Sequence, residues 1–536
     1  MHAKPKPTPK SKPAAAATPC GRAKTTPLGM GDVFMTSDED ELPLAKAEPV
    51  AKKESAAVMK RPAGNGLAGA RAKKNTLVAA DANDGREMPG NSGAFAYAKW
   101  CVELLSPEDA DHLSMLPPLR VGSMCSGMCT EALAFKAIQM AMLTRRGQFP
   151  DVTIEFVVEN CQAKRKILRK FLPTALVLTE IGDLAKSVVE DSYGNQCDQP
   201  TCDWLIGGLS CKCLSQLNSN PQPLLGDGPT GVSVRGMLTY IESLTFERRP
   251  RVVTIEEVTE LLKVRQCEPE QRASIQILTD RMDASGYSCS WEVHCSLDFF
   301  LPHQRVRVWP LFLKRGSMSA TIGMHEGAAA KLWDAHTNIA KFRTGGKHES
   351  LGTILDKLGG AASRDLKVLA NRQPISPETE AANKKFMEAN GVTAADLDRV
   401  QQLQDMLTDV VTLTPRASKA FVLKLVSEAK KKSWKWDSDM LVATAGQSVT
   451  FMKIRKDVFP NLTPGDAFVF LCAGIPAVAS GRLCMQMQGI HEDELCFMGL
   501  TDTSDEMLRN LAGNAFTANV CVASLLATML ALFSAH

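Results

Sequence analysis

The chain has 536 residues, 44% of them hydrophobic, which is enough to bury a sizeable core and a second folded region. Its formal net charge of only +3 gives no sign of a nucleic-acid partner, so any basic surface has to be local. The 16 cysteines follow an N-terminal stretch, MHAKPKPTPKSKP, that lacks the apolar segment of a secretory signal. This combination favours free thiols in a reducing compartment over a disulfide framework.

The N-terminal 92 residues are rich in lysine, alanine, proline and glycine and almost free of aromatic residues. Such a segment buries too little apolar area to offset its ordering entropy, so residues 1–92 are predicted to be a disordered tail. Two basic clusters, around Lys60 and Lys73, suggest a nuclear import signal or a nucleic-acid-binding arm, and hence the nucleus. A plain solvated tail explains them equally well, and the expected compartment is then the cytoplasm.

From residue 93 to 314 the chain alternates strand patterns with helical patterns. Short apolar runs predict strands at Leu119–Met124, Thr153–Val158, Ala175–Leu178, Asp203–Ile206 and Arg251–Ile255. This alternation is typical of an α/β, doubly wound, mostly parallel sheet. Ligands of such sheets bind beyond the carboxyl ends of the strands, so the informative residues should follow each strand directly.

The pattern changes in residues 315–480, which we predict to be a separate, smaller domain. A helical stretch, Ala394–Val411, precedes short predicted strands at Ser448–Ile454 and Ala467–Ala473. Residues 481–536 return to a glycine-marked turn and the longest apolar run, Val520–Phe533, and are expected to complete the first domain. That run is too short to span a bilayer, so it predicts a buried helix and no membrane association.

The sharpest motif, Gly207–Ser215 (GGLSCKCLS), follows the fourth predicted strand. Paired glycines let the backbone turn tightly and approach a ligand. A cysteine at this edge can be exposed, with its thiolate stabilised by the N-terminus of a following helix. The alternative is a cysteine buried as a small hydrophobe. No second cysteine pair or histidine pair completes a zinc site, so no metal is expected.

The motif resembles the nucleophile loop of the cytosine-5 methyltransferase family, G-G-x-P-C-Q-x-F-S. Ser210, Lys212 and Leu214 replace the family's proline, glutamine and phenylalanine. Other motifs of the family follow in the same order over residues 119–314 and 481–536, and this ordered set is specific. The family keeps its variable target-recognition domain in the region between.

The resemblance implies S-adenosylmethionine as cofactor and a Rossmann-like fold. The family's first turn falls on Cys125, Ser126, Gly127 and Met128. The acid that holds the ribose falls on Glu159, followed by Asn160, and the aspartate that meets the adenine falls on Asp183, followed by Leu184. The asparagine of the closing motif is Asn514. These nine residues are the predicted cofactor site.

The resemblance also implies covalent catalysis. Cys211 would add to carbon 6 of cytosine, because carbon 5 is a poor nucleophile until a thiolate adds to the ring. Glu256 would act as the acid at ring nitrogen 3, and Arg307, supported by Arg305, would hold the ring carbonyl. An ordinary ion pair at a sheet edge is the alternative for Glu256 and the two arginines. No residue identifies the base that removes the proton from carbon 5.

Members of the family flip the target base out of a duplex, which requires a basic cleft. The predicted nucleic-acid contacts mix cations with an aromatic ring in the middle region: Lys430, Lys431, Lys432, Trp434 and Lys435. A solvated basic helix end is the competing interpretation. DNA is the first expectation for the substrate; RNA, or a catalytically silent relative that only binds nucleic acid or cofactor, are the alternatives, and the sequence names no protein partner.

Several positions depart from the family's pattern. Cys129 and Thr130 stand where glycines are usual and could crowd the cofactor. Glu257 replaces an asparagine, and His303 a glutamine. Lys212 could lower the thiol pKa of Cys211 or could simply mark drift. Cys213 is a rival nucleophile, although the spacing of the motif selects Cys211.

Overall fold

A computed structural model describes residues 88–316 except 216, 217 and 219, and then 324–357, 362–363, 375–409, 413, 415–445, 448–464, 467–472 and 474–533. The predicted tail lies outside these residues except for 88–92, and so do both of its basic clusters. At the end of that tail, the backbone N–H of Ser92 donates to Glu349 Oε2 at 2.8 Å. The side chain of Ser92 is buried.

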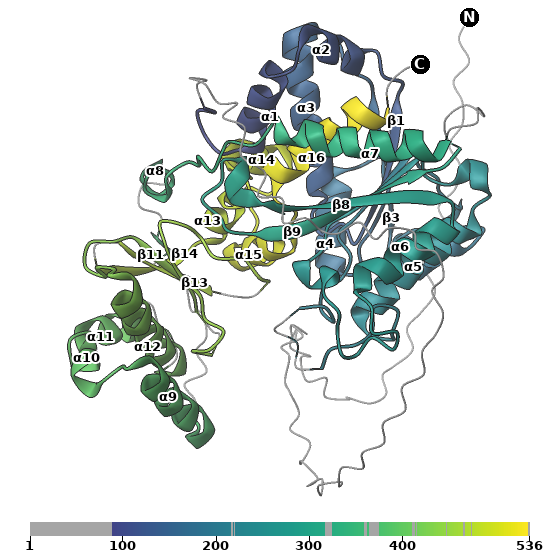
Figure 1. Cartoon of the computed structure of the whole chain (residues 1–536). Helices are drawn as coiled ribbons and strands as arrows, with labels where there is room; N and C mark the ends of the chain where they lie inside the picture. Colours follow the sequence, from purple (N-terminus) through teal and green to yellow (C-terminus); the bar gives the residue numbers. More distant parts are fainter. Residues whose placement is uncertain are drawn as a thin grey trace, which may run out of the picture. The chain divides into compact units, whose positions relative to one another are not determined.

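A seven-stranded sheet forms the centre of the larger domain, in the order β3-β2-β1-β6-β7-β9-β8 (Figure 1). The first five of these strands run parallel, whereas β9 is antiparallel to both β7 and β8. The strands are β1 (Leu119–Met124), β2 (Val152–Val158), β3 (Leu176–Leu178), β6 (Trp204–Gly207), β7 (Val252–Ile255), β8 (Tyr287–Cys295) and β9 (Val306–Lys314). The predicted α/β fold with a mostly parallel sheet is confirmed, and all five predicted strands are present.

Helices cover both faces of this sheet because its inner strands are apolar on both sides. On one face, α1 (Ala94–Glu103), α3 (Thr130–Arg146), α7 (Met324–Ala340) and α16 (Ala518–Leu532) share a core with strand residues such as Val121 and Ile206. On the other face, α5 (Pro229–Ser243) and α6 (Ser274–Ala284) share a second core with strand residues such as Leu205 and Val253.

The C-terminal helix α16 is buried, as predicted. The stretch Asp505–Leu532 is long and apolar enough to cross a membrane by composition, but 89% of its most apolar window is buried inside the protein. Asn519 on this helix donates to the carbonyls of Ser92 at 3.2 Å and Phe299 at 2.9 Å. Helix α16 therefore joins segments that are far apart along the chain.

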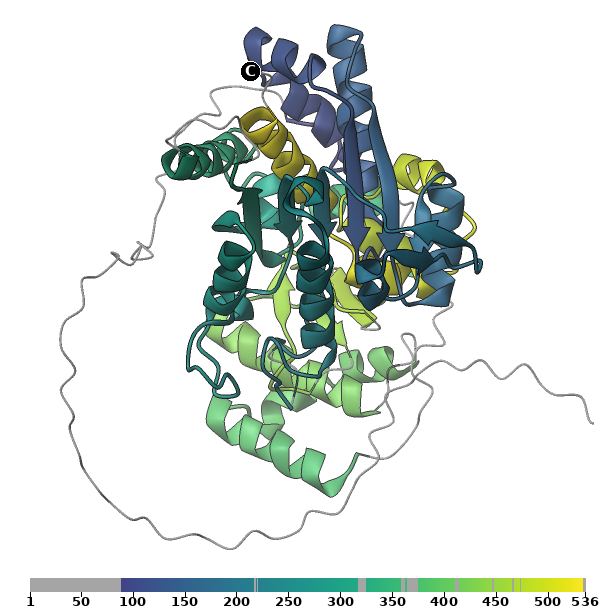
Figure 2. The same ribbon diagram turned by 90° about the vertical axis from the view of Figure 1, so that its right-hand side faces the viewer.

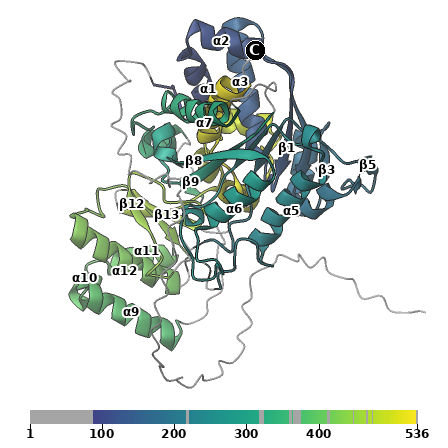
Figure 3. The same ribbon diagram turned by 45° about the vertical axis from the view of Figure 1, so that its right-hand side comes forward.

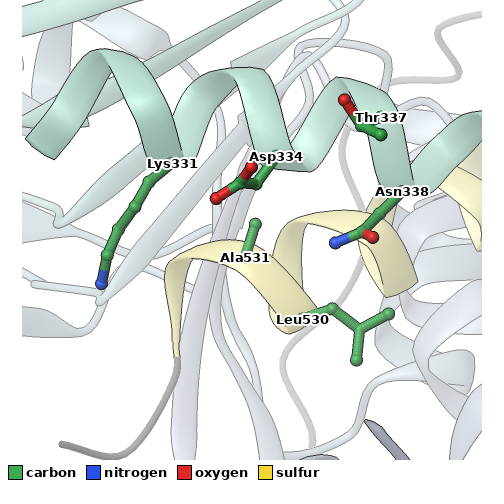
Figure 4. A pocket seen from close by; sticks show the side chains of 6 residues that line it. All are labelled: Lys331, Asp334, Thr337, Asn338, Leu530 and Ala531. Atoms are coloured by element: carbon green, nitrogen blue, oxygen red, sulfur yellow. The ribbon is translucent and has the colours of Figure 1, made fainter. Parts of the chain in front are cut away.

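Helix α7 lies beside α16 in both Figures 1 and 2. It falls within the residues assigned from sequence to the smaller domain, but its buried residues belong to the core of the larger one. A hollow between the two helices is lined by Lys331, Asp334, Thr337, Asn338, Leu530 and Ala531 (Figure 4). None of these residues belongs to a motif identified in the sequence.

The smaller domain contains an antiparallel sheet in the order β10-β14-β13-β11-β12, packed against helices (Figure 3). Its elements are α9 (Pro377–Asn390), α10 (Ala394–Asp398), α11 (Gln401–Asp409), α12 (Pro415–Lys432), β10 (Ala362–Ser363), β11 (Leu441–Ala445), β12 (Ile454–Lys456), β13 (Ala467–Cys472) and β14 (Ile475–Ala479). Alternate residues of β13 face two cores. Val469 and Leu471 pack with the helices of this domain, whereas Phe468 and Phe470 join the main core.

The predicted strand Ser448–Ile454 is wrong for most of its length. The carbonyl of Ser448 accepts hydrogen bonds from the N–H groups of Phe451 at 3.0 Å and Met452 at 2.8 Å, which closes a turn. This turn connects β11 to β12, which begins only at Ile454. The predicted helix Ala394–Val411 is divided into α10 and α11.

The remaining elements are α2 (Pro107–Ser114), α4 (Gln162–Phe171), η1 (Ile181–Ala185), β4 (Val188–Glu190), β5 (Gln196–Asp198), η2 (Phe246–Arg248), η3 (Thr259–Leu262), η4 (Ser296–Phe299), α8 (Leu351–Lys357), α13 (Gly481–Gln486), α14 (Glu492–Phe497) and α15 (Asp505–Asn514).

Candidate active site

The predicted site residues converge because of the strand order. The chain passes from β1 outward to β2 and β3, and then returns to the other side of β1 with β6 and β7. The carboxyl ends of these parallel strands share one edge, and β1 and β6 flank the point where the order reverses, which is where such sheets bind ligands. Because β9 is antiparallel to β7, Arg305 and Arg307 at the start of β9 lie at this same edge.

The loop after β6 is held from two sides. A Cβ added to Gly208 would lie 2.6 Å from the ring of Phe516, so the second glycine of the motif is required for packing. The backbone N–H of Ser210 donates to Ser233 Oγ at 3.2 Å. A proline, which the family has at this position, could not make that bond. The departure at Ser210 therefore replaces a rigid residue by a hydrogen bond.

The helix expected directly after Cys211 is not formed. The carbonyl of Cys211 instead accepts from the N–H groups of Leu214 at 3.0 Å and Ser215 at 2.9 Å, which makes a turn. The next helix, α5, begins only at Pro229 because a long loop comes first. The predicted stabilisation of the thiolate by a helix N-terminus is therefore wrong.

Charged side chains act on the Cys211 thiol instead. Burial raises its pKa to about 11, the nearby carboxyls Glu257 and Glu256 add to this rise, and Arg307 and Arg305 oppose it. Lys212 is exposed and is not among these groups. The two arginines therefore favour the nucleophilic thiolate form.

The rival nucleophile Cys213 is packed away. Its side chain is buried, and its sulfur lies so close to Gly228 that no side chain would fit there. Its backbone N–H donates to Thr230 Oγ1 at 2.9 Å. This position favours Cys211 as the reactive cysteine of the motif.

The carboxyl of Glu256 lies between two guanidinium groups. Its Oε1 is 3.3 Å from Arg305 Nη2 and 3.2 Å from Arg307 Nε. Burial lowers the pKa of Arg305 to about 10, and the charge of Arg307 adds to this effect. The ion pair predicted from sequence as the alternative role of Glu256 is thus present. Its charges also act on the Cys211 thiol, so the same contacts can hold Glu256 in place as a catalytic acid.

Glu257, which replaces the family's asparagine, is also buried. Its Oε2 accepts from the N–H of Val258 at 2.9 Å, while its Oε1 has no hydrogen-bond partner among the described residues. Burial raises its pKa to about 8, and the charge of Glu256 contributes. Near pH 7 the side chain is therefore mostly uncharged, as the usual asparagine is.

The turn after β1 is bound to the end of β2. The N–H of Ser126 donates to the carbonyl of Val158 at 3.1 Å, and the N–H of Gly127 donates to Glu159 Oε2 at 2.9 Å. Cys125, Gly127 and Cys129 all have a left-handed backbone, with φ of 53°, 55° and 57°. This conformation favours glycine, so the two cysteines are held in it at some cost.

The residues that could crowd the cofactor turn are buried in the core. Cys129 and Thr130 are 0% and 1% exposed, and Cys129 belongs to the main apolar cluster, as does Met128. The conformation that glycine would adopt is thus preserved at Cys129, while the side chain lies in the core.

The other predicted cofactor residues lie along the same edge. The buried carboxylate of Glu159 also accepts from the N–H of Cys161 at 2.8 Å, and Asn160 beside it is exposed. Asp183, after β3, is half-buried and pairs with Lys186 at 2.6 Å, while Leu184 is buried. The carbonyl of Asn514 lies 3.4 Å from the point where a Cβ of Gly127 would be.

These residues fit S-adenosylmethionine. The Glu159 carboxylate accepts two N–H bonds, which leaves acceptor positions free for ribose hydroxyls. No atom lies within 4 Å of a Cβ added to Gly182, next to Asp183, so there is open space there. Glu159, the turn at Gly127, Asp183 and Asn514 are the residues that would hold the cofactor.

The predicted nucleic-acid contacts at the end of α12 have partners within the smaller domain. Lys430 pairs with Asp396, and Lys431 Nζ donates to Asn390 Oδ1 at 2.7 Å. Lys432 pairs with Glu428 at 2.7 Å and lies 4.4 Å from the ring centroid of Trp434. The backbone N–H of Lys435 donates to Asp439 at 2.8 Å. Their contact with nucleic acid stays a prediction.

Sequence reasoning missed the backbone groups of Phe459 and Leu462, which reach the site from the smaller domain. No signal in the sequence could have identified them, because every residue carries the same main-chain groups. Among the described residues, no three histidine, cysteine, aspartate or glutamate side chains gather where they could hold a metal ion.

A family model described as C-5 cytosine-specific DNA methylase matches residues 119–441. The chain belongs to this family. The family implies a methyltransferase that acts on cytosine and uses S-adenosylmethionine. The match extends beyond the motifs into the smaller domain.

One curated relative, named DNA (cytosine-5-)-methyltransferase DMT5, from Cryptococcus neoformans var. grubii, is 25% identical over 447 residues. The alignment covers 77% of this chain but only 17% of that much longer protein. Among solved structures, the Dnmt2 methyltransferase of S. pombe is 10% identical with a TM-score of 0.36, and Entamoeba histolytica methyltransferase EhMeth is 8% identical with 0.37. Both alignments cover 77% of this chain and 98% of the other, but TM-scores this low say nothing about the site.

Proposed function

We propose that the chain methylates carbon 5 of cytosine in DNA through a covalent adduct with Cys211. The observation that carries this proposal is the meeting of Cys211, Glu256, Arg305 and Arg307 at one edge of the sheet, where the charges of the last three act on the thiol. The family supports cytosine as the target, and the relative named as a DNA methyltransferase favours DNA over RNA.

In the proposed reaction the Cys211 thiolate forms a bond to carbon 6 of the ring. Negative charge then builds toward ring nitrogen 3 and the ring carbonyl. Glu256 stabilises it by donating a proton at nitrogen 3, and Arg307 by holding the carbonyl oxygen. Arg305 positions Glu256 through its own contact with Oε1.

S-adenosylmethionine, when bound, would supply the electrophilic methyl group that carbon 5 takes up. Once carbon 5 carries the methyl group, nitrogen 3 returns its proton to Glu256. A base then takes the proton from carbon 5, the bond between sulfur and carbon 6 breaks, and Cys211 leaves as the thiolate. The smaller domain would bind the target, with Lys430, Lys431, Lys432, Trp434 and Lys435 as candidate contacts.

The test is covalent trapping on 5-fluorocytosine, because the fluorine at carbon 5 cannot leave as a proton does. Random-sequence pools of DNA and RNA containing this base would be incubated with S-adenosylmethionine and the wild-type protein, and adducts read on a denaturing gel. We expect an adduct with DNA. Cys211→Ser should abolish it, whereas the matched control Cys213→Ser should retain it because Cys213 is buried away from the site.

The other outcomes identify the alternatives. An adduct with RNA alone would replace DNA by RNA as the substrate. No adduct with either pool, while calorimetry shows that the cofactor binds, would indicate a catalytically silent relative. An adduct that persists in Cys211→Ser would remove this residue from the mechanism.

A further inference from the structure

A short segment of the smaller domain, Phe459–Pro464, lies against the loop that carries the site's arginines. The N–H of Phe459 donates to the carbonyl of Pro302 at 2.7 Å, and the N–H of Gln304 donates to the carbonyl of Phe459 at 2.8 Å. Phe459 is fully buried in the main core. The segment is thus fixed to the loop by backbone pairing and by an apolar anchor.

The same segment reaches the catalytic acid through Arg305. One end of this guanidinium donates from Nη1 to the carbonyl of Leu462 at 3.3 Å, and the other end lies 3.3 Å from Glu256 Oε1. Arg305 is 5% exposed, so its guanidinium is held by protein groups such as these two in place of water. A displacement of Leu462 would therefore change how Arg305 holds Glu256.

The far end of the segment touches the predicted cofactor site. A Cβ added to Gly513 would lie 2.6 Å from both the Cα of Pro464 and the carbonyl carbon of Thr463. Only glycine allows this approach, because backbone atoms cannot move aside as a flexible side chain can. Gly513 precedes Asn514, whose carbonyl faces Gly127 of the cofactor turn.

His303 is the side chain that joins these contacts. Its Nε2 accepts from the N–H of Leu462 at 3.3 Å, and its buried Nδ1 has no hydrogen-bond partner among the described residues. Burial keeps the pKa of this histidine well below its usual range, and the charges of Arg305 and Arg307 act in the same direction. A neutral imidazole can accept the N–H of Leu462 at Nε2, as the amide oxygen of the family's glutamine can.

We propose that Phe459–Pro464 is a positioning segment of the active site, which sets the arginines around Cys211 and Glu256 according to the placement of the smaller domain. His303 and Arg305 are its positioning residues. This inference rests on the proposed function only in assigning the segment a role in catalysis. The arrangement of the arginines can be measured without any methyl transfer.

The test uses the pH dependence of Cys211 alkylation by iodoacetamide, followed on the peptide that contains this cysteine by mass spectrometry. Arg307 and Arg305 favour the thiolate, so loosening them should raise the apparent pKa of Cys211. We expect His303→Leu to raise it by roughly 0.5 to 1 unit. His303→Gln, which keeps an acceptor for the N–H of Leu462, should leave it unchanged.

Gly513→Ala provides a second variant that acts at the other end of the segment, away from the arginines. Its Cβ would force Thr463 and Pro464 to move, and the apparent pKa of Cys211 should rise in this variant too. Circular dichroism melting identifies any variant that fails to fold. Should His303→Leu not fold, the comparison of Gly513→Ala with wild type decides the question.

Identical alkylation profiles in wild type, His303→Leu and Gly513→Ala would overturn the inference. So would an equal shift in His303→Gln and His303→Leu, because any change at His303 would then act alike. Trapping of 5-fluorocytosine by the wild type reports separately on the proposed function. A shifted profile without trapping would support the positioning segment and reject the methyl transfer.

Discussion

The sheet and the smaller domain contribute to the same site in different ways. The sheet edge provides side chains, namely Cys211, Glu256 and Arg307, from the ends of successive strands. The smaller domain provides main-chain groups, the amides and carbonyls of Phe459 and Leu462. A contact through a side chain restricts the residue type at its position, whereas a contact through the backbone does not. This difference explains why the motifs are confined to residues 119–314 and 481–536.

The largest effect should come from a side chain of the sheet edge. Glu256→Gln should lower kcat by roughly 10²- to 10⁴-fold, because the amide keeps the shape but cannot donate an acid proton. It also leaves two guanidinium groups without their shared carboxylate. Steady-state methylation assays check this prediction, with Glu242→Gln as control because Glu242 pairs with Arg281 at the surface. Equal kcat in both variants would mean that Glu256 serves only as an ion-pair partner.

A side chain of the smaller domain should act mainly through stability. Phe459→Ala removes a fully buried ring that packs 5.4 Å from the ring of Phe468, so we expect a loss of about 3–5 kcal/mol in the free energy of unfolding. Phe451→Ala is the control, because 51% of that side chain is exposed, and should change it by less than about 0.5 kcal/mol. Urea unfolding measures both. A similar small loss in each would show that the segment is not anchored by Phe459.

A smaller, pH-dependent effect is expected at Glu257. Its raised pKa, about 8, means that the unfolded chain releases this proton near pH 4.5 while the folded protein keeps it to about pH 8. Its contribution to stability is therefore complete below pH 4.5 and is lost as the pH rises to about 8. Glu257→Asn, which restores the family's residue, should gain stability relative to wild type across this window, by an amount on the order of a few kcal/mol at pH 8. Melting temperatures at pH 5 and 8.5 check it; a constant difference between the two proteins would contradict the buried neutral carboxyl.

The smallest effect is expected at the end of α12. Lys431→Ala breaks one exposed hydrogen bond to Asn390, which should cost under about 1 kcal/mol of stability. If this lysine contacts a phosphate, the slope of log affinity against log salt should fall by about one. Fluorescence anisotropy with a DNA duplex at several salt concentrations measures the slope. An unchanged slope would leave Lys431 as part of a solvated helix end.

The sequence predicted the parts of the fold that depend on local pattern. The five parallel strands are short apolar runs, and their shared edge made the convergence of Cys211, Glu256 and Glu159 predictable. Strands β8 and β9 were not predicted. In β8 the apolar residues Trp291 and Val293 are exposed, while the polar residue His294 is buried. The strand therefore lacks the alternation of buried apolar and exposed polar residues by which a strand is predicted.

The parts of the site that could not be predicted depend on distant contacts. The partner of Lys430 is Asp396, 34 residues earlier, and that of Arg305 is the backbone of Leu462, 157 residues later. The uncharged state of Glu257 depends on burial, which is a property of the packed structure. The turn after Cys211 follows from hydrogen bonds that any residue could make.

The position of α16 has a consequence for biosynthesis. This helix packs in the main core, and its Asn519 donates to the carbonyl of Ser92, 427 residues earlier. At a synthesis rate of about 5–20 residues per second, roughly 20 to 80 s separate the emergence of β1 from that of α16. During that time the part of this apolar face that α16 covers stays exposed at the ribosome, so we expect translation of this chain to depend on chaperones that bind exposed apolar surfaces.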